Sequence, residues 1–192
     1  MRLGIYGGTF NPIHYGHLKA ALKAREQFSL DKIFFIPTKE PVHKESSPFI
    51  SSADRCRMIE LALSGNKYFF LSKTEVEREQ PSYTVYTLRE IKKEYPSSQI
   101  FLLLGSDSFE RFHTWKNYQE ILASTFLLVL RRPGGGMINK ALEKFSNIKI
   151  TDNSMQPISS SDIRERRQQG KSIKGLVPEV VREYIYEKDL YR

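Results

Sequence analysis

Residues 2–18 read RLGIYGGTFNPIHYGHL, and this stretch decides the fold that the sequence predicts. A strand-like apolar run over Arg2–Tyr6 leads into a turn with two glycines, Gly7 and Gly8, and a helix follows. A glycine turn lets the backbone approach a phosphate group, and the N-terminus of the following helix favours anions. The stretch has neither the Gly-Lys-Ser/Thr of a Walker loop nor the glycine spacing of the dinucleotide fingerprint, so it predicts a phosphate site of another kind.

The rest of the chain alternates between short apolar runs and longer amphipathic ones. Further strands are expected at Lys32–Ile36, Tyr68–Ser72, Gln99–Leu104, Thr125–Leu130 and Ile148–Thr151. Helices are expected at about 16–28, 52–64, 84–94, 107–122 and 137–146, and then, without strands between them, at about 160–169 and 178–187. Continuous hydrophobic strands that alternate with helices are typical of a parallel sheet covered on both faces. We therefore expect one α/β domain over 1–192, a Rossmann-like parallel sheet flanked by helices, with a small helical C-terminal appendage at 158–192.

Composition and charge narrow the class of protein. The 192 residues are 40% hydrophobic and 27% charged, which suffices for a packed core and argues against wholesale disorder. The single cysteine, Cys56, excludes a disulfide within the chain and a multi-cysteine zinc site. The formal net charge of +8 comes from dispersed basic residues, which favours a small anionic ligand over nucleic acid. Because no segment resembles a signal peptide or a membrane span, we expect a cytoplasmic protein without a membrane partner.

Two histidines stand three residues apart at the expected start of the first helix. His14 and His17 fall on the same side of its first turn, and Gly16 between them is expected to leave room for a polyphosphate. Two imidazoles in this place can donate hydrogen bonds to phosphoryl oxygens whose charge grows in a transition state. The alternatives are a pair of metal ligands or two surface histidines. Because helical metal sites more usually have ligands four residues apart and a third ligand, we expect phosphate chemistry and no metal site.

A serine-rich segment in the last third of the chain offers a second phosphate site. Residues 158–164 read ISSSDIR. Hydroxyls and free backbone N–H groups at a helix start can bind phosphate, and Arg164 adds a forked cation one turn later. Taken alone, the segment is explained better by serine capping of a helix beside a solvated arginine. Together with the first motif, phosphate binding is favoured.

The stretch over 7–18 is similar to the signature of the HxGH nucleotidyltransferase superfamily, and it more narrowly resembles the bacterial nicotinate-nucleotide adenylyltransferases. The resemblance extends across the chain and includes the ISSSDIR segment. It implies transfer of AMP from ATP to nicotinate mononucleotide, which yields nicotinate adenine dinucleotide and pyrophosphate, with Mg²⁺ entering as Mg-ATP. Asn11 stands where most members have Asp, and because Asn keeps the turn-forming ability of Asp, we expect little consequence.

The resemblance also implies which residues bind and act. The catalytic set is His14, His17, Lys44 and Arg164. ATP would be bound by Gly7, Gly8, Thr9, Phe10, His14, His17, Gly105, Asp107, Ile158, Ser159, Ser160 and Arg164. The mononucleotide would be bound by Tyr83, Thr84, Asp107, Trp115 and Arg131. A lone tryptophan is more often a core residue, but the polar neighbours of Trp115 suit a platform that stacks on the pyridine ring. Tyr86 stands where many members have Asp, which puts the surroundings of Thr84 in question.

Several alternatives stay open at this point. The same chemistry could act on nicotinamide mononucleotide or phosphopantetheine, and the motifs after the first favour the nicotinate compound. A different class is a non-catalytic module that binds a nucleotide or RNA, although the expected strands lack the aromatic and basic pattern of an RNA-binding sheet. The sequence does not fix the oligomeric state, so a homo-oligomer is among the alternatives.

Overall fold

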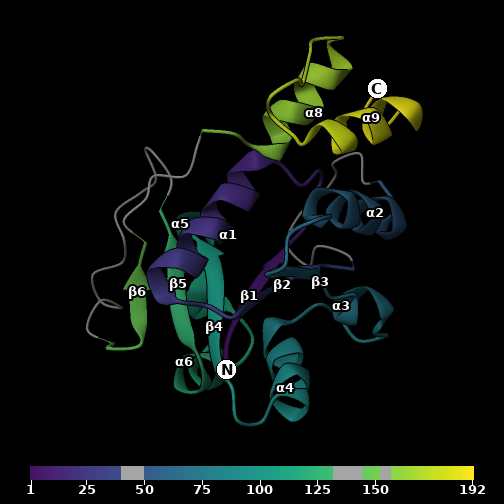
Figure 1. Cartoon of the computed structure of the whole chain (residues 1–192). Coiled ribbons are helices and arrows are strands. Elements are labelled where there is room, and N and C mark those ends of the chain that lie inside the picture. The colour runs from purple at the N-terminus through teal and green to yellow at the C-terminus, as the bar shows by residue number, and fades with distance from the viewer. Residues whose placement is uncertain (40–49, 132–144, 152–156) are drawn as a thin grey trace.

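Six parallel strands form the centre of the molecule in the computed structural model, which describes residues 1–39, 50–131, 145–151 and 157–192 (Figure 1). The strands are β1 Arg2–Gly8, β2 Lys32–Pro37, β3 Phe69–Leu71, β4 Gln99–Gly105, β5 Phe126–Leu130 and β6 Ile148–Ile150. Across the sheet they follow the order β3-β2-β1-β4-β5-β6, and each neighbouring pair is parallel. The predicted Rossmann-like parallel sheet is confirmed. Its order reverses beside β1, and the carboxyl ends of β1 and β4 at such a switch point are where open α/β sheets bind ligands.

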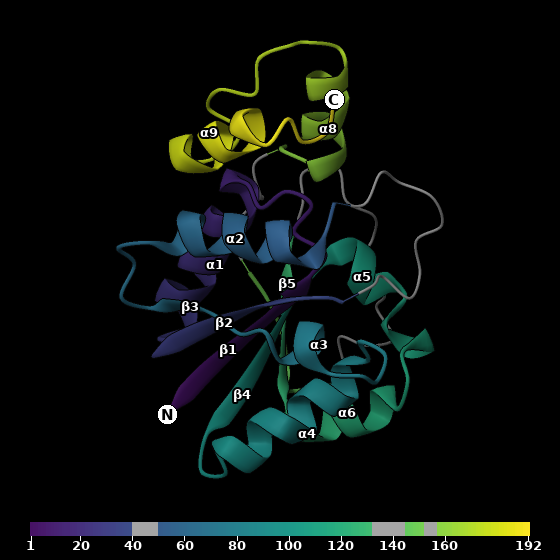
Figure 2. The ribbon, with the colours of Figure 1, turned by 90° about the vertical axis from the view of Figure 1, so that its right-hand side faces the viewer.

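Helices cover both faces of the sheet (Figure 2). The helices in the described residues are α1 Tyr15–Phe28, α2 Ser52–Leu63, α3 Thr74–Glu77, α4 Thr84–Glu94, α5 Ser106–Glu110, the 3-10 helix η1 Phe112–Thr114, α6 Tyr118–Ser124 and the C-terminal α8 Ser160–Gln168 and α9 Glu179–Glu187. One hydrophobic cluster joins the sheet to α1, α2 and the C-terminal helices, and a second joins the opposite face to α4, α5 and α6. The sheet is therefore the middle of three layers.

The side chains of β4 show how one strand supplies both clusters. Phe101 and Leu103 point to the face covered by α1, whereas Ile100, Leu102 and Leu104 point to the face covered by α4. All five are buried. A strand buried on both faces has no position for a polar side chain, which explains why the strands read as continuous hydrophobic runs.

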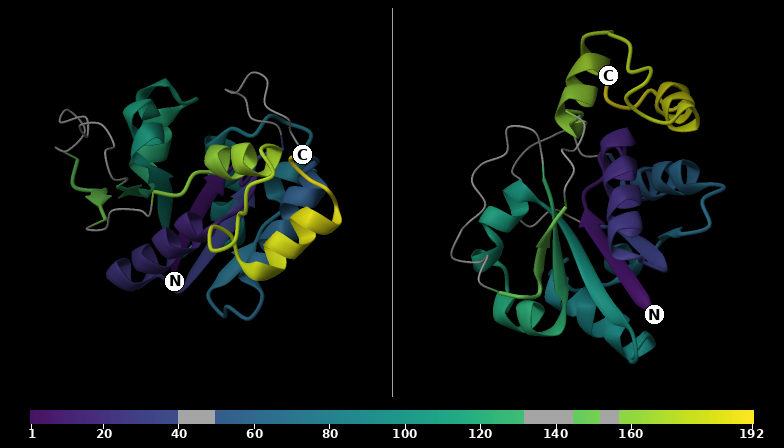
Figure 3. Two further views of the ribbon diagram at one scale, coloured as in Figure 1. Left: turned by 90° about the horizontal axis from the view of Figure 1, so that it is seen from above. Right: turned by 60° about the vertical axis from the view of Figure 1, so that its left-hand side comes forward.

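The C-terminal helices α8 and α9 lie beside the start of α1 and against α2 (Figures 1 and 3). The backbone N–H of Tyr15 donates to the carbonyl of Leu176 over 3.0 Å. On the other side, the Tyr184 hydroxyl donates to Asp54 Oδ1 over 2.8 Å and joins α9 to α2. The appendage thus contacts the sheet domain next to the glycine turn that follows β1.

Most of the expected elements occur with bounds that differ by one or two residues. The single helix expected over 107–122 is wrong, because α5, η1 and α6 divide that segment. Asn117 adopts a left-handed conformation with φ 50°, which a continuous helix does not permit. The short α3 was not expected, and the helix expected at about 137–146 lies almost wholly outside the described residues. No helix in the described part of the chain is both long and apolar enough to cross a bilayer.

Candidate active site

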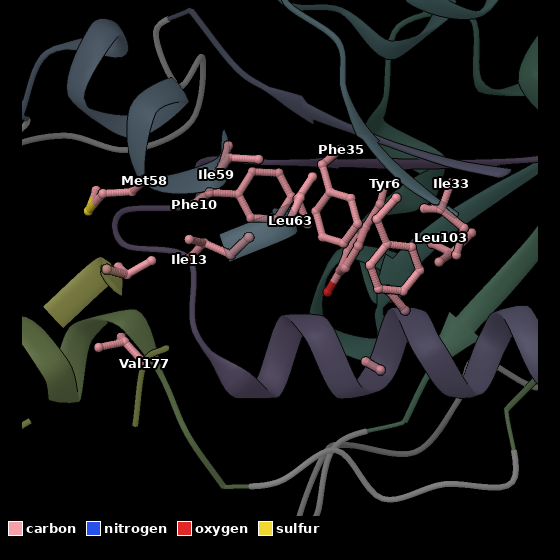
Figure 4. Packing of buried hydrophobic residues seen from close by; sticks show 14 of the residues in the cluster. Tyr6, Phe10, Ile13, Ile33, Phe35, Met58, Ile59, Leu63, Leu103 and Val177 are labelled. Atoms are coloured by element: carbon pink, nitrogen blue, oxygen red, sulfur yellow. The ribbon is translucent and has the colours of Figure 1, made fainter. Parts of the chain in front are cut away.

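An aromatic cluster packs against the turn after β1 and holds it in place. Phe10 has a φ of 47°, and its ring packs edge-on against Tyr6 and beside Phe35, with centroids 5.5 and 5.7 Å away. Figure 4 shows the side chains of Phe10, Phe35 and Tyr6 close together. A Cβ on Gly8 would lie 3.2 Å from the Phe10 ring, so a side chain there would press on the cluster. Phe10 is only 2% exposed, so its side chain belongs to the hydrophobic cluster that supports the turn.

The two histidines of the motif lie at the start of α1 and touch each other. His14 is the N-cap residue in an extended conformation, and its ring stacks on that of His17 with centroids 3.7 Å apart and planes inclined by 26°. The His14 backbone N–H donates to His17 Nδ1 over 3.3 Å. A neutral imidazole that accepts at Nδ1 has its proton at Nε2. His17 therefore presents an Nε2–H donor, the group that a phosphoryl oxygen requires.

Gly16 makes room for a neighbouring ring. A Cβ on Gly16 would lie 2.9 Å from both Cε1 and Nδ1 of His14 and 3.4 Å from the carbonyl oxygen of Ile158. The space on the Cβ side of Gly16 is thus occupied by the His14 ring. Gly16 permits the histidine pair to stack, and His14 is 1% exposed.

The serine-rich segment at the start of α8 packs onto the same turn. Ser159 caps α8, since its Oγ accepts a hydrogen bond from the backbone N–H of Asp162 over 3.0 Å. Ser160 Oγ donates to the carbonyl of Pro12 over 2.9 Å. The capping interpretation is therefore right for Ser159, while Ser160 links two motifs that are 148 positions apart.

Arg164 crosses from α8 to the turn. Its Nη1 donates to the carbonyl of Asn11 over 2.9 Å, and its Nη2 donates to Ser161 Oγ over 3.3 Å. A guanidinium has five N–H donors, and these two hydrogen bonds orient its plane. The second motif thus brings a fixed positive charge to the segment that leads into His14.

Two residues that hold the turn were not singled out from the sequence. Arg55 of α2 is 1% exposed, and it donates from Nη1 to the carbonyl of Thr9 and from Nη2 to that of Lys39, each over 2.9 Å. Burial lowers the pKa of Arg55 below its ordinary value. An arginine on the apolar face of a predicted helix is the signal that could have identified it. The Tyr191 hydroxyl donates to Asn11 Oδ1 over 2.6 Å, and no local pattern marks this contact.

The ends of β4 and β5 supply a neighbouring part of the site. Gly105 ends β4 and pairs with Leu130 of β5, so that Asp107 and Arg131 follow adjacent strand ends. Both of these charged side chains are exposed, whereas Ser106 between the glycine and the aspartate is 3% exposed. The structure therefore places Gly105, Asp107 and Arg131 on the carboxyl edge of the sheet, beside the turn after β1.

Tyr83, Thr84 and Trp115 lie on the α4 side of the molecule. Trp115 follows η1 and is half-buried, with its ring tilted against Phe112 at a centroid distance of 5.5 Å. The ammonium of the next residue, Lys116, lies 4.7 Å from the centre of the Tyr83 ring, which connects the two segments. A hydrogen bond to Tyr86 raises the pKa of Lys116. Tyr86 thus contacts Lys116 through both its ring and its hydroxyl.

A buried network supports the segment that carries Tyr83 and Thr84. Arg78 donates to the carbonyl of Pro81 over 3.2 Å and to Thr87 Oγ1 and Glu90 Oε1 over 3.3 Å. Thr87 donates in turn to Glu75 Oε1 over 2.6 Å. Burial raises the pKa of Glu75, which is 4% exposed. The network fixes the start of α4 relative to α3.

The end of β2 is tied to the same segment. The backbone N–H of Lys39 donates to Ser82 Oγ over 3.0 Å, and Lys39 Nζ donates to the carbonyl of Arg78 over the same distance. Lys44, expected in the loop that follows, lies outside the described residues. Within the described ranges, no three His, Cys, Asp or Glu side chains are grouped so that they could hold a metal ion.

Comparison with known proteins gives a consistent picture over the whole length. A family model described as cytidylyltransferase-like matches residues 5–166. A protein of Desulfitobacterium hafniense named "Probable nicotinate-nucleotide adenylyltransferase" is 41% identical over 199 residues, which cover 100% of this chain and 96% of that protein. A protein of the same name from Dictyoglomus turgidum is 43% identical over 195 residues, with the same shares covered.

A solved structure shares the fold. The Plasmodium falciparum nicotinic acid mononucleotide adenylyltransferase, complexed with NaAD, matches with a TM-score of 0.82 at 21% sequence identity. The match covers 99% of this chain and 97% of that one. It therefore includes both the parallel sheet and the C-terminal helices.

Proposed function

The chain belongs to the cytidylyltransferase-like family and, within it, to the nicotinate-nucleotide adenylyltransferases, and from this premise we propose how its site transfers the AMP group of ATP to nicotinate mononucleotide. The products are nicotinate adenine dinucleotide and pyrophosphate. The observation that supports this chemistry best is the stacked pair His14 and His17, which lies at a helix start with Arg164 bound to the same turn. The acceptor is inferred from the relatives, whose similarity extends over the full chain.

The reaction is an in-line displacement at phosphorus. A phosphate oxygen of the mononucleotide attacks the α-phosphorus of ATP, and the bond from that phosphorus to the oxygen bridging to the β-phosphorus breaks. The electron pair of that bond leaves with pyrophosphate. No covalent enzyme intermediate is needed, because the acceptor is already a nucleophilic anion. Catalysis then consists of positioning and charge stabilisation.

The phosphates of ATP would lie over the turn after β1. His17 donates from Nε2 to a phosphoryl oxygen, His14 supports its ring, and the backbone of Gly7–Phe10 lines the approach. Arg164 faces the departing pyrophosphate with a guanidinium already oriented by Asn11 and Ser161. Lys44 is proposed to add a second cation from the loop after β2.

The remaining site residues divide between the two substrates. Gly105 and Asp107 would meet the ribose and adenine parts at the end of β4, and the start of α8 would contribute Ile158, Ser159 and Ser160 to the ATP side. Tyr83, Thr84, Trp115 and Arg131 would bind the mononucleotide. Trp115 is already packed against Phe112. A ring that is held in this way can present its other face to a pyridine.

Mg²⁺ belongs to the substrate in this proposal. It enters as the counter-ion of ATP and is held chiefly by phosphate oxygens and water, as is usual for this small and strongly hydrated cation. Both substrates are metabolites of the cell interior, so a cytoplasmic location is part of the proposal.

Pyrophosphate release tests the proposal directly. The purified protein is given Mg-ATP with nicotinate mononucleotide, nicotinamide mononucleotide or phosphopantetheine in parallel reactions. We expect rapid release with nicotinate mononucleotide and much slower release with the others. Release only with another acceptor would retain the histidine chemistry but overturn the roles of Thr84 and Trp115. No release with any acceptor would favour a nucleotide-binding module without catalysis.

A further inference from the structure

The penultimate residue of the chain contacts the turn that leads to the histidine pair. The Tyr191 hydroxyl donates to Asn11 Oδ1 over 2.6 Å, although the two residues are 180 positions apart. Tyr191 is 5% exposed and Asn11 is 3% exposed, so water does not compete for this hydrogen bond. Neither side chain has a part in the displacement described above.

The conformation of the last residues is imposed by contacts with the rest of the protein. Asp189 and Tyr191 both adopt the left-handed region, with φ of 49° and 61°, which residues other than glycine rarely occupy. Arg167 Nη2 of α8 donates to Asp189 Oδ1 over 2.8 Å, and the backbone N–H of Leu190 donates to the carbonyl of Ile185 over 2.9 Å. The tail is thus anchored to α8 and α9, and these anchors aim the Tyr191 ring inward.

Asn11 connects this tail to the proposed phosphate site. The Asn11 carbonyl accepts a hydrogen bond from Arg164, and the Asn11 side chain accepts one from Tyr191. The carbonyl of the next residue, Pro12, accepts one from Ser160. Asn11 precedes His14 by three positions. A shift of the turn at Asn11 would therefore move the N-cap residue of α1, and with it the stacked imidazoles.

The hydrogen bond between Tyr191 and Asn11 does not depend on the protonation of either side chain in the pH range of activity. Burial raises the pKa of Tyr191 above its ordinary value of 10.0, while the nearby guanidiniums of Arg164 and Arg55 act in the opposite direction. The hydroxyl therefore stays protonated and donates at every working pH. The amide oxygen of Asn11 is a neutral acceptor, so the hydrogen bond does not neutralise either guanidinium.

We infer that Tyr191 is a positioning residue, whose hydroxyl holds Asn11 and thereby keeps His14 and His17 in place for phosphoryl transfer. The inference rests on the proposed function for its effect on turnover. Its effect on the geometry of the histidine pair can be measured without any substrate. A loss of the hydroxyl should therefore be visible both in the rate and in the imidazole signals.

Tyr191→Phe is the test variant because it removes only the hydroxyl. Tyr186→Phe is the matched control, since Tyr186 is 40% exposed on α9 and its substitution also removes one hydroxyl. At a temperature where both variants are fully folded, we expect Tyr191→Phe to lower kcat about fivefold, the scale of one lost neutral hydrogen bond, with KM for each substrate changed less than about twofold. Equal kcat in the two variants would overturn the inference.

NMR signals of the imidazole rings distinguish a positioning role of Tyr191 from a purely structural one, because a purely structural role would leave them unchanged. Signals of labelled His14 and His17 should shift in Tyr191→Phe and stay in place in Tyr186→Phe, while those of the exposed His113 stay in place in both. If Tyr191→Phe lowers only the unfolding midpoint and leaves these signals unchanged, Tyr191 is a structural residue and the inference fails. If the wild-type protein releases no pyrophosphate with any acceptor, the proposed function fails, and the signals still decide the role of Tyr191.

A double-mutant cycle completes the test. Asn11→Ala removes the acceptor, so adding Tyr191→Phe to it should lower kcat little further. Independent, multiplicative losses in the double variant would show that Tyr191 does not act through Asn11.

Discussion

The rings of His14 and His17 stack at 3.7 Å, and the second ring accepts a hydrogen bond from the backbone N–H of the first residue. The rings of Phe10 and Tyr6 make T-shaped contacts with the His17 ring, with centroids 5.1 and 6.0 Å from its centroid, and restrict its rotation. Two imidazoles in such contact restrict each other's rotation. They are best understood as one unit, in which His14 is buried and His17 presents its Nε2–H.

Removal of either ring should therefore stop most of the reaction. We expect His17→Ala to lower kcat by about 10²- to 10³-fold, as when a donor to a developing charge is lost, while circular dichroism and the unfolding midpoint stay close to wild type. The double variant with His14→Ala should lose far less than the product of the two single losses, because the rings act together. His113→Ala, which removes an exposed imidazole, is the control. Near-normal turnover in His17→Ala would refute its assigned role.

Gly16→Ala tests the stacking itself. The added Cβ would meet ring atoms of His14 at 2.9 Å, and the cheapest relief is rotation of that ring. Because alanine favours a helix more than glycine does, we expect the free energy of unfolding to change by less than about 1 kcal/mol. We expect kcat to fall at least about tenfold, measured beside Lys19→Ala on the exposed face of the same helix. A variant that keeps full turnover would show that the stacked geometry is dispensable.

The sheet could be predicted because its causes are local. Each buried strand is a short apolar run, and a strand such as β4 shows the same pattern whatever its partners are. One short stretch of sequence contains the glycine turn, His14 and His17, so a phosphate site could be predicted from it. The hydrophobic pattern over 107–122 does not predict the interruptions of that helix, because Trp115 turns extended with ψ 144° and Asn117 turns left-handed with φ 50° without changing the pattern.

The residues that hold the site could not be predicted in the same way. Arg55 and Tyr191 act on the turn through single hydrogen bonds to partners 46 and 180 positions away. Such pairs depend on how α2 and the C-terminal residues pack against the turn, and the hydrophobic pattern of the sequence does not predict that packing. Asn11 was interpreted as a neutral replacement in a turn, although its side chain is the point at which the tail is bound.

Arg164 should need its forked shape as well as its charge. Lysine keeps the charge, but it cannot reach the Asn11 carbonyl and Ser161 Oγ with a planar pair of donors. We expect Arg164→Lys to lower kcat about tenfold or more, and Arg164→Ala to lower it further. Arg166→Ala is the matched control, since Arg166 is exposed on the same helix and forms an i,i+4 ion pair with Asp162. Wild-type kinetics in Arg164→Lys would remove the guanidinium from the mechanism.

Trp115 should affect one substrate more than the other. Its ring rests on Phe112 and adjoins Tyr83 through Lys116, on the side of the molecule proposed for the mononucleotide. We expect Trp115→Ala to raise KM for nicotinate mononucleotide about tenfold, the scale of one lost aromatic stack, and to change KM for ATP less than about twofold. Trp115→Phe should restore part of the difference. Equal effects on both substrates would exclude Trp115 from the pyridine pocket.

The buried carboxyl of Glu75 gives the fold a dependence on pH. Burial raises the pKa of Glu75 above the ordinary value of 4.5, and the charge of Glu90 adds to the rise. The hydrogen bonds from Thr87 and Ser82 and the charge of Arg78 lower the pKa and offset only part of this rise. The folded protein thus binds this proton more tightly than the unfolded chain does. The resulting stability is complete below pH 4.5 and is lost as the pH rises through the folded pKa.

Glu75→Gln should abolish this dependence. The amide keeps an oxygen that can accept from Thr87 and cannot ionise, so the stability of the variant relative to wild type should increase as the pH rises from about 4.5 towards neutrality. Urea unfolding of both proteins at a series of pH values measures the difference. Glu79→Gln, at an exposed position on the same segment, is the control, and its curve should run parallel to that of wild type. If the difference between Glu75→Gln and wild type is constant over that range, Glu75 does not change its protonation on unfolding.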